Sequence, residues 1–129
     1  MRVRPKRPFV VILGGAKLET KMPLLKRFLK TADAVIIGGI LANTIYALQG
    51  GEIGKSKLDM KAGLNAPSLL RNKKLHVPRD VVVVKNLRGS ARRFVKDIKT
   101  VGPDDYIVDI GERSIRHFSS VLNNAATIV

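Results

Sequence analysis

The chain contains no cysteine, few aromatic residues, few acidic residues and no long apolar run. Without cysteine, its 129 residues can form no disulfide, thiolate metal site or thiol nucleophile. Aromatic residues make up only 5%, which leaves little surface on which nucleic-acid bases could stack. No apolar run reaches the roughly 18 residues of a spanning helix, and the basic start "MRVRPKRP" lacks the apolar segment of a signal peptide. These absences fit a cytoplasmic protein with no membrane partner.

The charge of the chain is strongly unbalanced. Lysine and arginine number 24 against 10 acidic residues, which gives a net charge of +14. Such an excess attracts polyanions of any kind. The basic residues are scattered from Arg2 to Arg116, however, which favours a basic surface without a specific partner, or a chain that lacks an acidic remainder, over nucleic-acid binding. The 45% of hydrophobic residues suffices for the core of one domain.

Short apolar runs alternate with segments of helical periodicity. Strands are expected at 8–13, 33–39, 74–77, 80–85, 106–110 and 126–129, more weakly at 90–98, and helices at 20–30, 40–49, 112–124 and, in a short form, 68–72. This alternation predicts an α/β fold, a Rossmann-like parallel sheet with helices on both faces. The chain stops inside an apolar strand, so the sheet is expected to be incomplete at both ends.

The stretch "GGAKLETK" follows directly on the first strand. In an open parallel sheet, ligands bind beyond the carboxyl ends of the strands, where Gly14 and Gly15 would lie. The next helix is expected to have Thr20 as its N-cap, with free N–H groups facing the same crevice. Lys17 and Lys21 are unfavourable near a helix N-terminus unless an anion compensates them. The stretch therefore indicates either a phosphate chain held by the loop or a tight strand–helix turn with two solvated lysines.

Five motifs identify a family resemblance. The segment "RPFVVILGGAKLETK" closely resembles the start of the nucleotide-binding domain of the phosphoglycerate kinases. "AVIIGGILANT", "GEIGKS", "LHVPRDVVVV" and "YIVDIGERSI" resemble later motifs of that family in the same order, and "NNAATIV" falls where the family has the strand that leads into "WNGPxGxFE". The resemblance runs from about Lys6 to Val129. It identifies residues 1–129 as part of the C-terminal, nucleotide-binding domain of such a protein.

The resemblance assigns roles to the first glycine and lysine stretch. It implies that Lys17 is catalytic and accompanies the transferred phosphoryl group, while Lys21 binds the nucleotide phosphates. It implies that Gly15 and Ala16 present their backbone to the nucleotide. These roles agree with the phosphate interpretation of the same residues.

The resemblance also implies where the adenine lies. Gly38 and Gly39 would form part of the flat wall of its pocket, and Ile107 stands near a glycine that lines the nucleotide site in the family. Leu58 falls near the leucine that packs on the adenine, although its neighbour Lys57 fits the same position if the alignment shifts by one.

Ile40 stands where the family often has a third glycine, which narrows the expected pocket. Glu112 replaces the usual proline after the "DIG" motif, which suits a helix start.

The implied function is reversible phosphoryl transfer between ATP and 3-phosphoglycerate in glycolysis, with Mg²⁺ and ATP or ADP as cofactors. The family binds 3-phosphoglycerate through its N-terminal domain, is usually monomeric, and ligates magnesium through a "GGGD" loop that has no counterpart in this sequence. No metal ligand is therefore expected here, and the isolated chain is expected to be inactive. The alternative is a non-catalytic basic α/β module that binds RNA or other polyanions.

The remaining polar groups have simpler interpretations. His76 and His117 have no partner at metal-ligand spacing and are expected to be packed or surface residues. Asp104 and Asp105 lie in a Gly-Pro turn, where aspartate is common because its side chain bonds the local backbone.

Overall fold

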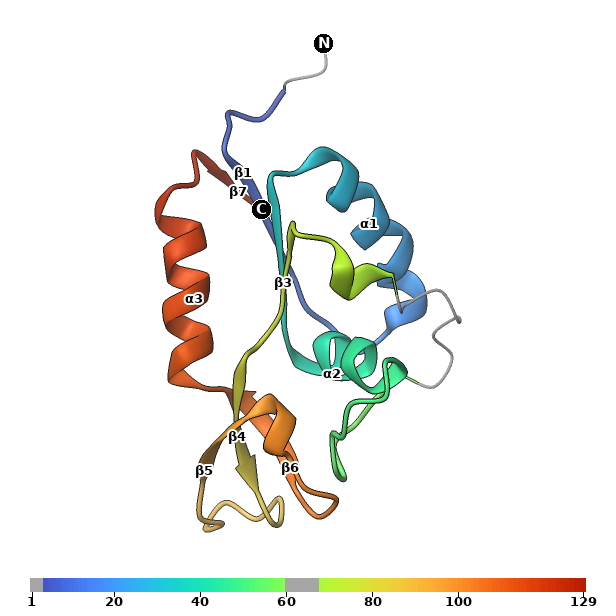
Figure 1. Cartoon of the computed structure of the whole chain (residues 1–129), viewed down its shortest axis with the longest axis vertical. Coiled ribbons are helices and arrows are strands. Elements are labelled where there is room, and N and C mark those ends of the chain that lie inside the picture. Colours follow the sequence, from blue (N-terminus) through green and yellow to red (C-terminus); the bar gives the residue numbers. More distant parts are fainter. Residues whose placement is uncertain (1–3, 60–67) are drawn as a thin grey trace.

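The computed structural model describes residues 4–59 and 68–129 (Figure 1). In chain order the elements are β1 (Phe9–Leu13), α1 (Leu18–Thr31), β2 (Ala34–Ile37), α2 (Gly39–Leu48), a 3₁₀ turn (Leu69–Arg71), β3 (Leu75–His76), β4 (Asp80–Val84), β5 (Phe94–Asp97), a 3₁₀ turn (Ile98–Thr100), β6 (Tyr106–Ile110), α3 (Glu112–Asn123) and β7 (Thr127–Ile128). The expected order of strands and helices is confirmed. Among these residues no helix is both long enough and apolar enough to cross a membrane.

Four strands form a parallel sheet in the order β3-β2-β1-β7. Strands β1 and β2 pair over four residues, from Val10 opposite Ala34 to Leu13 opposite Ile37. Helices α1 and α2 lie on one side of this sheet and α3 lies on the other (Figure 1). The α/β fold with helices on both faces is therefore confirmed.

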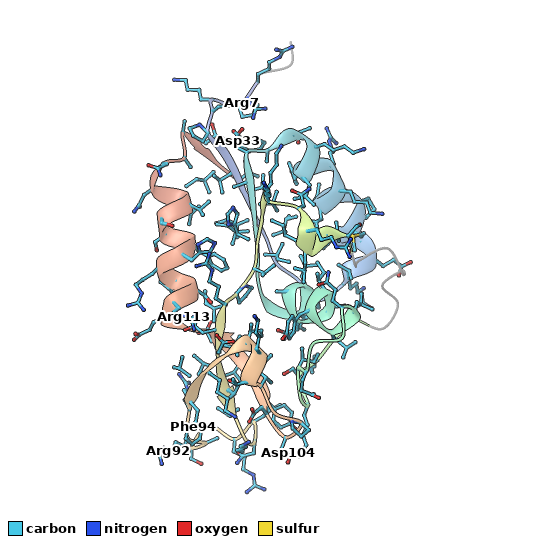
Figure 2. All side chains as sticks on the ribbon, viewed as in Figure 1. Arg7, Asp33, Arg92, Phe94, Asp104 and Arg113 are labelled. Carbon is cyan, nitrogen blue, oxygen red and sulfur yellow. The ribbon has the colours of Figure 1, made fainter. Side chains whose placement is uncertain are left out.

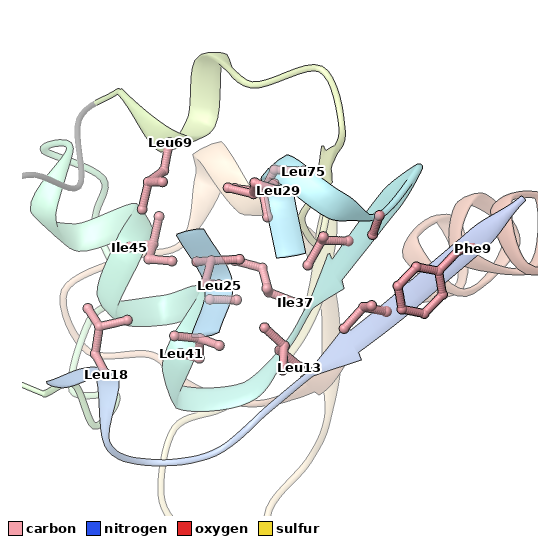
Figure 3. Packing of buried hydrophobic residues seen from close by; sticks show 14 residues of the cluster. Phe9, Leu13, Leu18, Leu25, Leu29, Ile37, Leu41, Ile45, Leu69 and Leu75 are labelled. Carbon is pink, nitrogen blue, oxygen red and sulfur yellow. The ribbon is translucent and has the colours of Figure 1, made fainter. Parts of the chain in front are cut away.

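Alternate residues of the central strands pack on opposite faces of the sheet. Val11 and Ile37 contribute to the larger core, which α1 and α2 cover, whereas Val10 and Ile36 pack toward Phe118 of α3. Figure 3 labels the main residues of the larger core: Phe9, Leu13, Leu18, Leu25, Leu29, Ile37, Leu41, Ile45, Leu69 and Leu75. Burial on both faces explains why these strands are continuous apolar runs in the sequence.

The strand at 106–110 was expected in the parallel sheet, and this expectation is wrong. It is β6, which pairs antiparallel with β4 in a separate three-stranded sheet of order β5-β4-β6. Between β4 and β6 the chain forms only β5 and a 3₁₀ turn, and it has no α-helix of the kind that usually connects parallel neighbours. An apolar run shows that a strand is buried, but it does not show the direction of its partner.

The start of α1 also differs from the expectation. The helix begins at Leu18 with Lys17 at the N-cap, and the Thr20 hydroxyl donates to the Lys17 carbonyl (3.1 Å) instead of capping. The Leu18 N–H donates to a carboxylate oxygen of Asp59 (2.6 Å). Pro23 consequently lies inside the helix and not in its first turn. The group that meets the helix start is 41 residues away, so the local sequence could not show it.

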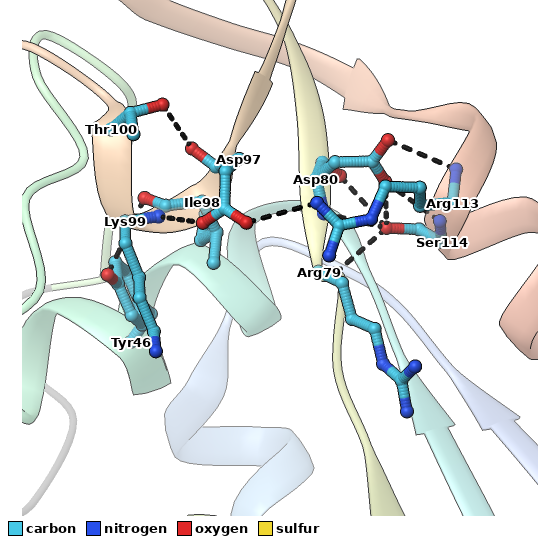
Figure 4. Close-up of polar contacts among 9 residues, drawn as sticks. All are labelled: Tyr46, Arg79, Asp80, Asp97, Ile98, Lys99, Thr100, Arg113 and Ser114. Atoms are coloured by element: carbon cyan, nitrogen blue, oxygen red, sulfur yellow. Dashed lines mark hydrogen bonds and ion pairs between the residues drawn. The ribbon is translucent and has the colours of Figure 1, made fainter.

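A buried carboxylate joins β4 to α3. Asp80 accepts hydrogen bonds from the Ser114 N–H (2.8 Å), the Ser114 hydroxyl (2.7 Å) and the Arg113 N–H (3.1 Å), as Figure 4 shows. Burial raises the pKa of Asp80, but these hydrogen bonds outweigh it and leave the pKa below its ordinary value. Asp80 therefore occupies the N-terminus of α3 from a different element, where a negative charge also complements the helix dipole.

A second buried carboxylate holds the antiparallel sheet together. Asp105 is fully buried and accepts from the ammonium groups of Lys85 (2.6 Å) and Lys96 (2.8 Å), and from the Gly102 N–H (2.8 Å). Burial raises the pKa of Asp105, but the two lysines and the Gly102 N–H hold it well below its ordinary value. The bond from the Gly102 N–H is the local turn bond that the sequence predicts, whereas the sequence did not predict the ion pairs with Lys85 and Lys96. Its neighbour Asp104 is exposed at the lower end of the molecule (Figure 2).

The two histidines contact each other, although no such pairing was expected. His76 Nδ1 of β3 and His117 Nε2 of α3 lie 2.9 Å apart, at hydrogen-bond distance. Burial lowers the pKa of both rings, and the charge of Arg79 lowers them further. The pair therefore favours at least one neutral ring in the folded protein.

Replacing Asp105 with Asn should lower the free energy of unfolding by roughly 2–3 kcal/mol near neutral pH, because two lysines lose their charge partner. The folded-state pKa lies below the ordinary value of 3.8, so this stabilisation is complete above that value and is lost as the pH falls below it. Urea unfolding across this pH range should show the difference between the two proteins shrinking in acid. Asp104→Asn, the same change at an exposed neighbour, is the control, and an equal loss there would contradict the account.

The histidine pair predicts a loss of stability in mild acid. The folded pKa values lie below 6.5, so the unfolded chain binds protons first as the pH falls through that value. His117→Gln keeps a polar side chain without the titration and should reduce the loss of unfolding free energy between about pH 7.5 and about pH 5.5. Denaturant unfolding at both pH values measures this, with Arg116→Gln on the same helix as control. An unchanged pH dependence in His117→Gln would refute the role of the pair.

Candidate functional site

The two glycine motifs lie side by side at one edge of the parallel sheet. Strands β1 and β2 are parallel and end opposite each other, with Leu13 paired to Ile37. The Gly38 N–H donates to the Leu13 carbonyl (3.3 Å), so the end of β1 and the start of α2 meet directly. Residues 14–17 and 38–39 are therefore adjacent beyond the carboxyl ends of these strands, where open α/β sheets bind ligands.

The backbone of the loop after β1 lies close to the side chain of Lys21. Gly15 has a φ of +131°, and a Cβ added at Gly15 would lie 3.3 Å from Cε of Lys21. The Lys21 side chain thus runs along the glycine backbone and is half-buried, while Ala16 and Lys17 are exposed. Neither lysine has an ion-pair partner in the described part of the chain. The loop therefore brings together an open backbone and two uncompensated positive charges.

The start of α1 is less open to an anion than the sequence suggested. Its first N–H, that of Leu18, already bonds the Asp59 carboxylate. The Asp59 N–H donates to the Thr44 hydroxyl (2.9 Å), and this hydroxyl donates to the Ile40 carbonyl (2.7 Å). This chain of bonds couples α1, α2 and the loop after α2. It also places a negative charge at the helix N-terminus, which the nearby lysines must outweigh if a phosphate binds there.

A cavity lies between the start of α2 and β6. One part, of about 220 Å³, adjoins the second glycine motif, and a second part, of about 190 Å³, shares Ile40, Asn43 and Ile107 with it. The first part is also lined by Gly39, Pro78, Val81, Val108, Asp109 and Ile110, and the second by Ser56, Lys57, Leu87 and Tyr106. We call the two parts together the α2–β6 cavity. Gly39, with a φ of +59°, leads the chain into its wall.

Lys57 and Leu58 are the two candidates for the residue that packs on the base. Lys57 lines the cavity, whereas Leu58 is half-buried and does not. Ile107 lines both parts, and its N–H donates to the Ser56 hydroxyl (2.8 Å), which fastens the loop to β6. Asn43 was missed by sequence reasoning. Its only signal is its spacing of three from Ile40, which places both on one face of α2.

No set of metal ligands is found in residues 4–59 and 68–129. These residues contain no group of three or more His, Cys, Asp or Glu side chains that could hold an ion. The site is thus formed by backbone, two lysines and an adjoining, largely apolar cavity. This arrangement suits a ligand with a phosphate chain at one end and a flat apolar group at the other.

Comparison with known proteins agrees with this arrangement. The family model described as phosphoglycerate kinase matches residues 1–129. The chain is 37% identical over 125 residues to a phosphoglycerate kinase of Blochmanniella floridana, covering 97% of this chain and 31% of that protein. It is 40% identical over 126 residues to one of Baumannia cicadellinicola subsp. Homalodisca coagulata, covering 98% of this chain and 32% of that protein.

Two solved structures resemble the fold over nearly the whole chain. The phosphoglycerate kinase of Coxiella burnetii superposes with a TM-score of 0.86 at 34% identity, over 96% of this chain and 33% of that one. The enzyme of Pyrococcus horikoshii OT3 gives 0.75 at 26% identity, over 95% and 33%. The chain thus spans about a third of the length of the relatives that it matches. Because the family model covers every residue, and sequence and fold agree with it, the chain belongs to the phosphoglycerate kinase family.

Proposed function

We propose that residues 1–129 form part of the nucleotide-binding domain of an enzyme that transfers a phosphoryl group reversibly between ATP and 3-phosphoglycerate. The observation that carries this proposal is the bond from the Gly38 N–H to the Leu13 carbonyl, which sets the two glycine motifs at one edge, with Lys21 lying along Gly15. It supplies, at one edge of the sheet, the close backbone and the positive charge that a phosphate chain requires. Membership of the phosphoglycerate kinase family supports the choice of reaction.

Each predicted residue has a place in this proposal. Lys21 and the backbone of Gly15 and Ala16 bind the nucleotide phosphates, and Lys17 neutralises the charge on the transferred phosphoryl group. Such transfer depends on positioning and charge neutralisation more than on covalent chemistry, so an exposed, unpaired lysine is suited to the role.

The base enters the α2–β6 cavity. Gly39 and Ile107 line it, Gly38 directly precedes Gly39, and Leu58 follows the lining residue Lys57. The family implies Mg²⁺ with the nucleotide, but no described residues fit the ion, so no step is assigned to it here.

The residues that bind the second substrate are proposed to lie outside this chain. Because the chain matches about a third of its relatives' length, we assign 3-phosphoglycerate binding to residues beyond it. The chain by itself then binds ADP or ATP weakly and does not turn over. We propose that the full-length enzyme is monomeric and lies in the cytoplasm.

The binding role of Lys21 can be measured by calorimetric titration of the 129-residue chain with ADP at low salt. Lys21→Ala should weaken binding at least about tenfold, because a charge-assisted bond to phosphate is lost. Lys26→Ala removes an equal charge from an exposed position on the same helix and should leave the affinity nearly unchanged.

Equal losses in the two variants would contradict a specific phosphate site. Titration with an RNA oligonucleotide provides the second comparison. Binding of RNA that is tighter than that of ADP, unsaturable and steeply dependent on salt would favour the alternative, a basic module that binds polyanions.

A further inference from the structure

We propose that Lys57 makes this chain prefer a purine with an oxygen at position 6, such as guanine or hypoxanthine, over adenine. The inference rests on the proposed function, which places the base in the α2–β6 cavity. It concerns which nucleotide the site accepts, and it follows from the polar groups that line the cavity.

Four side chains bring polar groups to the part of the cavity that contains Lys57, and the rest of its lining is apolar. Its walls are formed largely by Ile40, Leu87, Tyr106 and Ile107, which suit the faces of a flat ring, and no carboxylate lines this part. The polar groups are those of Asn43, Ser56 and Lys57 and the hydroxyl of Tyr106. The Ser56 hydroxyl oxygen already accepts the Ile107 N–H (2.8 Å).

Lys57 differs from the other lysine of its loop. Lys55 has a carboxylate 3.7 Å away, that of Asp104, and its ammonium lies 6.0 Å from the centre of the Tyr106 ring. Lys57 forms no ion pair with any residue in the described ranges, and it lines the cavity where Lys55 does not. Its charge is therefore available to a ligand.

The hydroxyls of Ser56 and Tyr106 can each donate or accept a hydrogen bond, so they can serve either base. The amide of Asn43 both donates and accepts, so it can turn to suit either base edge. Lys57 has three donors and no acceptor. On the edge that carries positions 6 and 7, it can donate to both the 6-oxygen and N7 of guanine or hypoxanthine, whereas adenine offers it N7 alone, beside an amino group that presents only hydrogens. Discrimination between the bases thus falls to Lys57.

The size of the effect is limited by solvent. Hydrogen bonds to charged groups are among the stronger ones, but Lys57 is exposed and its charge is screened. We expect a preference of about five- to tenfold in the dissociation constant.

The experiment compares the dissociation constants of GDP, IDP and ADP for the 129-residue chain. IDP has the 6-oxygen of GDP but not its 2-amino group, so GDP and IDP should bind similarly and both more tightly than ADP. Lys57→Met keeps the length of the side chain without the charge and should abolish the preference. Lys55→Met, two residues away, should retain it.

Three results would overturn the inference while leaving the proposed function intact. The first is binding of ADP as tight as that of GDP and IDP, and the second is a preference that survives Lys57→Met. The third is a preference for GDP alone, with IDP resembling ADP, which would assign recognition to the 2-amino group. If none of the three nucleotides shows saturable binding, the proposed function fails and the inference fails with it.

Discussion

The register between β1 and β2 is the constraint on which the candidate site depends. Leu13 and Ile37 end their strands opposite each other, and all four residues of β2 are buried. Because side chains alternate between faces, a slip by one residue would exchange the two cores and is strongly disfavoured. This register sets Gly38 against the carbonyl of Leu13 and so brings two glycine motifs, more than twenty residues apart in sequence, to one edge. The packing of the sheet thereby determines where a phosphate chain could bind.

The few acidic residues of this basic chain are placed where elements meet. Asp59 joins the start of α1 to the loop after α2, Asp80 joins β4 to α3, and Asp105 joins the strands of the antiparallel sheet. Each accepts backbone N–H groups, and two of them are buried. Because these carboxylates are committed to structure, Lys17 and Lys21 at the start of α1 form no ion pair within the described chain. The charge of +14 is thus compatible with a specific anion site.

Sequence reasoning succeeded where the signal is local. Apolar runs predicted the strands, and helical periodicity predicted α1, α2 and α3 to within a few residues at their ends. The motifs and their order identified the family. The adjacency of the two glycine motifs also followed from the sequence, since neighbouring parallel strands end at one edge.

The failures share a physical cause, which is that the deciding partner is distant along the chain. Asp59 meets α1 at Leu18 across 41 residues, and the two histidines meet across 41 residues. The direction of β6 depends on its pairing with β4, which an apolar pattern does not encode. Lys57 and Leu58 cannot be distinguished by composition, because only the fold of their loop shows which one lines the cavity.

The most direct test of the nucleotide site is a titration of the isotope-labelled chain with ADP, followed by NMR of its backbone amides. The account predicts that Gly15, Ala16, Gly38 and Gly39 shift together with one saturable dissociation constant, while amides near His117 on the far side of the sheet do not respond. Shifts spread over basic residues throughout the surface, without saturation, would contradict it. They would show that ADP responds to the net charge of the chain and not to a site built by the glycine motifs.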